Sequence, residues 1–104
     1  YATMVARSRS ATGPYEVRPR PLYLVVEANE RWNAVGHNSV LRDAAGTDWI
    51  YYHGVDRLRP RSKPTDEVNT RRVMLMDRLV WRNGWPEVRG REPSSGVQPG
   101  PVVK

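Results

Sequence analysis

Apolar and polar residues alternate along several short segments of this chain, and no segment repeats its apolar residues with the period of a helix. Residues 38–42 and 48–53 are rich in β-branched and aromatic side chains, and the polar residues 43–47 between them supply turn chemistry. We therefore predict a β-hairpin. Its second strand carries large side chains on both faces, which is typical of a strand covered on both sides: Trp49, Tyr51 and His53 on one face, Ile50 and Tyr52 on the other.

The same alternation predicts about six strands in all, each short, as is usual in globular sheets. The prolines within residues 18–21 exclude a helix and make that segment an extended connector. Residues 28–35 are predicted to form a loop that displays Trp32, and residues 54–70 form a long loop without any period. The predicted strands are Tyr1 to Arg9, Leu22 to Glu27, Asn38 to Arg42, Asp48 to His53, Arg72 to Asp77 and Leu79 to Trp81.

The order of these strands indicates the fold class. Two strands are followed by four that join as neighbours in an up-and-down meander, and such meanders repeated radially are the blades of a β-propeller. We predict an all-β chain of about one and a half blades within one domain, residues 1–90. Residues 1–27 would form the outer half of one blade and residues 37–88 a complete blade, while the Pro-, Gly- and Ser-rich residues 91–104 would form a tail, either a linker or a frayed end.

Composition changes this picture little. The net charge of +6 would suit a polyanion partner, but 15 of the 17 basic residues are arginines spread along the whole chain, so a nucleic-acid role is not favoured. The chain has no cysteine, which excludes disulfides and thiolate metal sites. No apolar run approaches the roughly 20 residues of a membrane span, so we expect no membrane insertion.

Five segments, in this order and spacing, resemble the C-terminal third of glycoside hydrolase family 43, which contains arabinanases, arabinofuranosidases and xylosidases. The resemblance covers residue 1 to about residue 88. It implies a five-bladed propeller, of which this chain would be the last part, and an enzyme that is commonly secreted or periplasmic. The segments are Ala6 to Tyr15, Gly36 to Val40, Asp48 to His53, Asp77 to Trp81 and Gly84 to Pro86.

The resemblance also bears on catalysis. Members of the family use an aspartate general base, a second aspartate that tunes pKa and a glutamate general acid, all of which the resemblance places upstream of Tyr1. No carboxylate of this chain matches one of them, so no catalytic residue is assigned. Because the chain begins without an initiator methionine, we expect a processed or excerpted piece that is inactive and unstable without the missing N-terminal blades.

The chain is expected to contribute a wall of the sugar site. Strand direction in a propeller would place His37, His53 and the loop after His53 on the substrate face. Substrate-binding candidates are Trp32, His53, Arg71 and Arg72, although packing at a blade seam or ordinary ion pairs would explain these residue types equally well. The resemblance further implies that His37 helps to hold a central calcium ion through water, the alternative being a hydrogen-bonded histidine without metal.

Two other function classes stay open at this point. The first is a non-catalytic carbohydrate-binding or assembly module that uses Trp32 and the loop 54–70 as its rim. The second is a basic nucleic-acid binder, whose affinity would fall steeply with salt.

Overall fold

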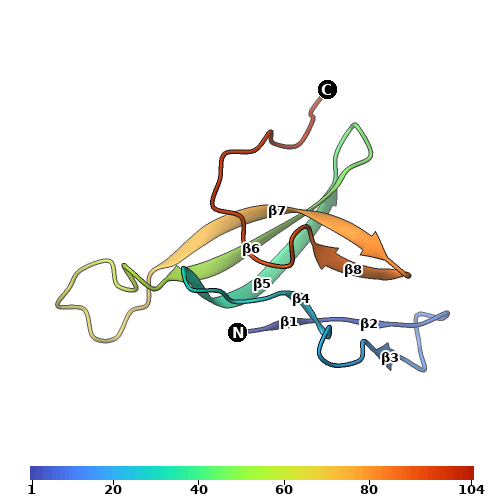
Figure 1. Cartoon of the computed structure of the whole chain (residues 1–104), viewed down its shortest axis with the longest axis horizontal. Helices are drawn as coiled ribbons and strands as arrows, with labels where there is room; N and C mark the ends of the chain where they lie inside the picture. Colours follow the sequence, from blue (N-terminus) through green and yellow to red (C-terminus); the bar gives the residue numbers. More distant parts are fainter.

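The computed structural model describes residues 1–104 and contains strands but no helix, which confirms the predicted all-β class (Figure 1). The strands form three antiparallel sheets, with orders β1-β4, β2-β3 and β5-β6-β7-β8. The four-stranded sheet keeps its strands in chain order, which is the meander of a propeller blade. The strands are β1 (Thr3–Met4), β2 (Ala6–Arg7), β3 (Glu16–Val17), β4 (Leu24–Val26), β5 (Trp32–Arg42), β6 (Asp48–Asp56), β7 (Arg72–Arg82) and β8 (Trp85–Val88).

The N-terminal strands differ from the prediction. The segment 1–9 is two short strands, and β2 pairs with β3, which was not predicted because β3 is only two residues long and lies directly before the proline connector. β4 pairs with β1 and lies against the blade. Together these strands form the half-blade that precedes the complete one in the chain.

The segment 28–35 is not all loop, because β5 begins at Trp32. The side chain of Trp32 is 8% exposed and belongs to the core, so the prediction that a loop displays this indole was wrong. The core fills the space between β4 and the four-stranded sheet, and Ile50 and Tyr52 contribute to it from one face of β6, as their predicted alternation requires. Its members are Val25, Val26, Trp32, Val35, Ile50, Tyr52, Leu79 and Val88.

The two strands predicted over residues 72–81 are one continuous strand, β7, and the fourth strand of the blade is β8. The prediction placed a break at Arg78, but the strand continues, and the neighbouring Asp77 is 3% exposed and accepts hydrogen bonds from the Tyr52 hydroxyl at 2.6 Å and the Ser94 amide at 3.2 Å. Pro86 within β8 is tolerated because β8 is the edge strand of the sheet and one of its sides needs no backbone donor.

The chain does not close on itself. Its radius of gyration is 15.3 Å, whereas a compact domain of this length has about 13 Å. Only 19 of the 104 residues are buried, so much of the sheet surface is exposed in this chain. A small sealed barrel or sandwich, which would have contradicted the propeller prediction, is not formed.

The structure contains no helix that could span a membrane.

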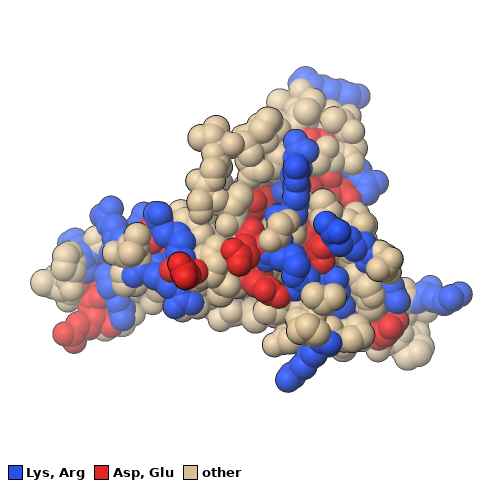
Figure 2. Space-filling model, viewed as in Figure 1, with Lys and Arg blue, Asp and Glu red and all other residues tan.

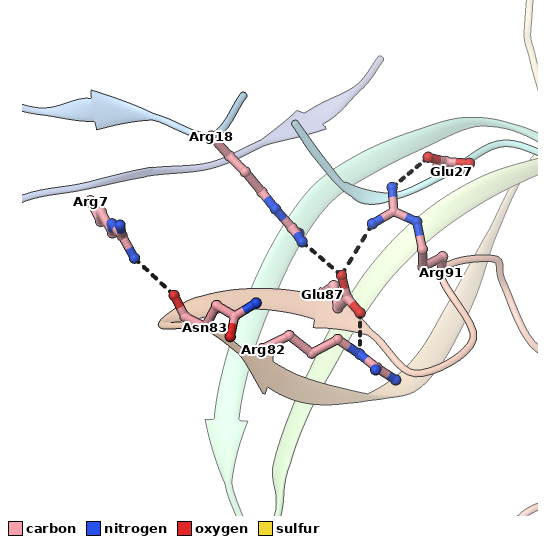
Figure 3. A network of polar contacts seen from close by, with 7 residues as sticks. All are labelled: Arg7, Arg18, Glu27, Arg82, Asn83, Glu87 and Arg91. Carbon is pink, nitrogen blue, oxygen red and sulfur yellow. Dashed lines mark hydrogen bonds and ion pairs between the residues drawn. The ribbon is translucent and has the colours of Figure 1, made fainter. Parts of the chain in front are cut away.

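A cluster of ion pairs around Glu87 joins the half-blade to the complete blade (Figure 3). The Arg18 guanidinium donates to Glu87 at 2.9 Å, and the two side chains are 6% and 5% exposed. Arg82 at the end of β7 and Arg91 after β8 contact the same carboxylate at 2.6 and 3.1 Å. Arg91 also pairs with Glu27, just after β4. Burial opposes ionisation of Glu87, but the hydrogen bond and charge of Arg18, with the charges of Arg91 and Arg82, keep its pKa below the usual value.

A second contact between the two parts involves Arg7 on β2. Its guanidinium donates to the carbonyl of Asn83 at 3.0 Å and lies 3.9 Å from the centre of the Trp85 ring. An arginine over an indole is a favourable cation–π pair. The half-blade therefore contacts and stabilises the turn between β7 and β8.

The C-terminal tail has no regular secondary structure, yet it is tied to the blade along its length. The Gln98 amide donates to the carbonyl of Met76 at 2.8 Å. Farther on, Val102 pairs with the β5–β6 turn, since its amide donates to Asp43 at 2.9 Å and its carbonyl accepts from Ala44 at 3.0 Å. The tail runs from β8 across the sheet toward the tip of the β5–β6 hairpin (Figure 1).

Replacing Glu87 with glutamine is expected to destabilise the fold by about 3 kcal/mol, because the buried Arg18 would keep its charge and lose its counterion. Glu16→Gln, which removes an exposed pair with Arg7, is the matched control and should change little. Urea unfolding measures both. The Glu87 contribution is present above its unfolded-state pKa of about 4.5 and is lost as the pH falls through the lower folded-state value. Equal losses for the two variants would contradict the role of Glu87.

Docking of the tail should depend on Asp43. The amide of Val102 and the indole of Trp49 donate hydrogen bonds to this carboxylate and lower its pKa to about 2, with the larger effect from Val102. Asp43→Ala should therefore increase hydrogen exchange at the amides of Ala44 and Val102, and in the parent protein their protection should persist on acidification until about pH 2. Asp66→Ala, in the distant β6–β7 loop, is the control. Unchanged exchange in Asp43→Ala would show that the tail is held without this carboxylate.

Candidate functional site

A shallow hollow of about 370 Å³ lies at the β5 side of the blade, where side chains from three strands meet. His37 comes from β5, His53 from β6 and Arg72 from the start of β7. The antiparallel pairing brings them together, because Gly36 is opposite His53 and His53 is opposite Met74. The β6–β7 loop emerges at this end of the sheet and the turn 43–47 lies at the other end, as the strand directions predicted (Figure 1).

Two bulges in β5 determine where His37 points. The pairing with β6 shifts its register on both sides of Gly36, and His37 has a φ of +52°. This left-handed conformation is uncommon for residues other than glycine, and bulges that redirect a side chain are frequent beside functional sites. Gly36 itself must lack a side chain, since a Cβ there would lie 2.9 Å from Cβ of Tyr1. The Gly-His pair thus leaves His37 exposed at the edge of the blade.

His53 lies between Tyr1 and His37. The Tyr1 ring meets it edge-on with 4.7 Å between ring centres, and the His37 ring is 6.2 Å away. Both imidazole nitrogens of His53 are buried and have no hydrogen-bond partner within the chain. Burial, followed by the positive charge of Arg72 and the neighbouring His37, lowers the pKa of His53, so the ring is neutral at pH 7.

Arg72 lies at the edge of the same hollow. Its guanidinium is 5.7 Å from the centre of the Tyr1 ring, and the residue is exposed. Sequence reasoning missed Tyr1 because it stands far from the histidines in the chain, and it missed Ser39 and Met74 because nothing distinguished them from other strand residues. The predicted alternation of β6 was the one signal that placed Tyr51 beside His53.

The other two candidates lie elsewhere. Trp32 packs in the core, which leaves its ring little surface for a sugar. Arg71 is turned into the β6–β7 loop, where its amide donates to the carbonyl of Pro60 at 2.8 Å and its guanidinium to the carbonyl of Arg59 at 3.3 Å. Of the predicted site residues, the structure therefore brings His37, His53 and Arg72 together and leaves out Trp32 and Arg71.

The residues of the chain do not by themselves fit a calcium site. No group of three or more His, Cys, Asp or Glu side chains is placed to hold a metal ion, and calcium takes six to eight oxygen ligands. His37 has the imidazole of His53 beside it rather than a carboxylate. Its water-mediated role toward a central calcium ion stays a prediction that depends on ligands from outside this chain.

No carboxylate lines the hollow. Three acidic side chains of β6 and β7 are occupied in structural contacts: Asp48 by Arg42 and Trp81, Asp56 by Arg31, and Asp77 by Tyr52. A neutral histidine and an arginine can donate hydrogen bonds to hydroxyl groups or pair with an anion, but they do not supply the two carboxyl groups that glycoside hydrolysis uses. The hollow is therefore suited to binding and orienting a ligand, and it lacks the groups for glycosidic bond cleavage.

Charges do not gather into one basic surface on the face that Figure 2 shows. Lys and Arg alternate with Asp and Glu over the centre of that face and over the β6–β7 loop. Nucleic-acid binding proteins present a continuous basic patch or stripe. The visible face therefore gives no support to a nucleic-acid partner.

Substituting Arg72 with glutamine should raise the pKa of His53, because the guanidinium charge disfavours the imidazolium form. NMR titration of the His53 ring measures the change. Arg59→Gln removes the same charge from the loop and should leave this pKa where it is. If neither substitution changed the titration, the guanidinium of Arg72 would not be close to His53.

Comparison with known proteins agrees with this geometry. None of the curated proteins matches the chain. The family model described as glycosyl hydrolases family 43 matches residues 1–86, which span the half-blade and the complete blade as far as the start of β8. This match covers most of the chain and ends before the tail, so the chain belongs to glycosyl hydrolases family 43.

Proposed function

We propose that this chain forms the C-terminal wall of the sugar site in a glycosidase that cleaves α-L-arabinofuranosyl or β-D-xylosyl linkages in plant-type polysaccharides. The family membership supports a glycoside hydrolase with a carbohydrate substrate. The observation that carries the proposal is the convergence of His37, His53 and Arg72 on one hollow that contains no carboxylate. In this proposal the catalytic aspartates and glutamate come from blades N-terminal to Tyr1.

The proposed reaction is an inverting hydrolysis. One carboxylic acid protonates the leaving oxygen while a carboxylate on the opposite side activates water, and the two groups stand about 6.5–9.5 Å apart. Arg72 would donate hydrogen bonds to sugar hydroxyls or pair with a catalytic carboxylate and keep it ionised. His53, neutral at pH 7, would complete the wall without competing for the proton.

The proposal requires neighbouring blades. Few residues are buried within the chain, and the apolar side chains of Val40 and Leu41 on β5 are 53% and 44% exposed. Repeated units that cannot bury their faces alone gain stability by stacking. A carbohydrate-binding module built around Trp32 is not favoured, since the indole is part of the core.

The test compares the isolated chain with the same chain joined to its N-terminal blades, using aryl arabinofuranosides and aryl xylosides. The isolated chain should give no turnover. In the complete enzyme, Arg72→Ala should lower kcat/KM by about 10- to 100-fold, the range for a lost hydrogen bond from a charged group. Arg59→Ala, in the loop, is the matched control. Turnover by the isolated chain at the rate of the complete enzyme would contradict the proposal.

A further inference from the structure

A second hollow, of about 420 Å³, opens beside β8, the strand at the opposite edge of the sheet from the histidines. Arg18, Arg82 and Arg91 line it together with Glu87, and the side chain of Asn83 stands at the same end of β7 (Figure 3). This hollow takes no part in the proposed sugar site. A ligand bound here would therefore be independent of the proposed function.

The charges around this hollow do not balance. Three guanidiniums face two carboxylates, because Glu87 is shared by all three arginines and Glu27 pairs only with Arg91. Arginine stays protonated in proteins, so the cluster carries one surplus positive charge. A surplus charge that is partly removed from water attracts an anion more strongly than an exposed arginine does.

Some guanidinium N–H donors of these arginines also have no hydrogen-bond partner. Nη1 of Arg18 is buried and has no hydrogen-bond partner within the chain, and the side chain as a whole is only 6% exposed. An unsatisfied donor of a buried charged group is costly, and here Glu87 accepts the one hydrogen bond that the Arg18 side chain makes. Arg82 contacts Glu87 through Nε, and its two Nη groups make no hydrogen bond within the chain. Since the Arg82 side chain is 68% exposed, this free edge of the guanidinium is accessible from the hollow.

We propose that this hollow is a binding site for one small oxyanion, a carboxylate or a phosphate. The free edge of the Arg82 guanidinium would donate two parallel hydrogen bonds to two oxygens of the anion, the bidentate geometry that guanidinium groups form with carboxylates and phosphates. The buried guanidinium of Arg18 and that of Arg91 would contribute to the surplus positive charge of the cluster that attracts the anion. A carboxylate could belong to a uronic acid residue of an acidic polysaccharide, and a phosphate to the free ion.

The experiment measures binding to the full protein by isothermal titration calorimetry at low salt, with three probes: inorganic phosphate, glucuronate and the methyl ester of glucuronate. Phosphate or glucuronate should bind, and the ester, which has no charge, should not. Binding should weaken with added salt, since it depends on charge. Stronger binding of glucuronate than of phosphate would indicate a saccharide ligand, and the reverse would indicate the free ion.

Two variants test the location. Arg82→Gln should weaken binding about tenfold by removing the exposed fork while Arg18 and Arg91 still neutralise Glu87. Asn83→Asp introduces a carboxylate at the rim and should weaken binding without removing an ion pair, and aspartate tolerates the φ of +53° at this position as asparagine does. Arg59→Gln, in the β6–β7 loop, controls for the loss of one positive charge. The proposal fails if no anion binds, or if both rim variants, folded as judged by their thermal melts, bind as the parent protein does.

Discussion

The buried carboxylate of Glu87 holds the two parts of this molecule together. It pairs with guanidinium groups from the connector after β3, from the end of β7 and from the segment after β8, so that the half-blade, the complete blade and the tail meet at one point (Figure 3). The cost of removing Glu87 from water is offset because three partners surround it. The same excess of partners leaves the cluster with more positive than negative charge.

The other edge of the sheet is formed by β5. This strand carries two bulges and keeps its pairing with β6. These bulges place His37 at the edge of the blade and leave room for Tyr1 over Gly36. The hollow formed there by a neutral histidine, an exposed histidine and an arginine has the chemistry of a binding wall, and as part of a five-bladed propeller of glycosyl hydrolases family 43 it would face groups supplied by other blades.

Much of this fold can be predicted from local patterns in the sequence. The hairpin of β5 and β6 and the two-sided burial of β6 were predicted because alternation of large side chains is a direct consequence of the pleat. The break predicted at Arg78, between Asp77 and Leu79, was wrong because charged residues do not end a strand where distant partners are available. Here Tyr52 and the tail supply donors to Asp77 from distant parts of the chain, which no local pattern records. The prediction for Trp32 was wrong for a related reason. β5 begins at Trp32, but its first residues are bulged and do not show the alternation by which strands were predicted.

The site was only partly predictable. His37, His53 and Arg72 could be proposed from the family resemblance and the strand directions, but their meeting with Tyr1 depends on the pairing of β1 with β4. The Glu87 cluster was not anticipated because Arg18 was predicted to lie in an extended connector with no assigned partner. The most direct test of the account is a crystal structure of the complete enzyme with an arabinose- or xylose-containing oligosaccharide bound. We predict that Arg72 and the two histidines line the sugar pocket and that every catalytic carboxylate comes from outside residues 1–104. A sugar bound away from this hollow, or a carboxylate of this chain at the scissile bond, would contradict the account.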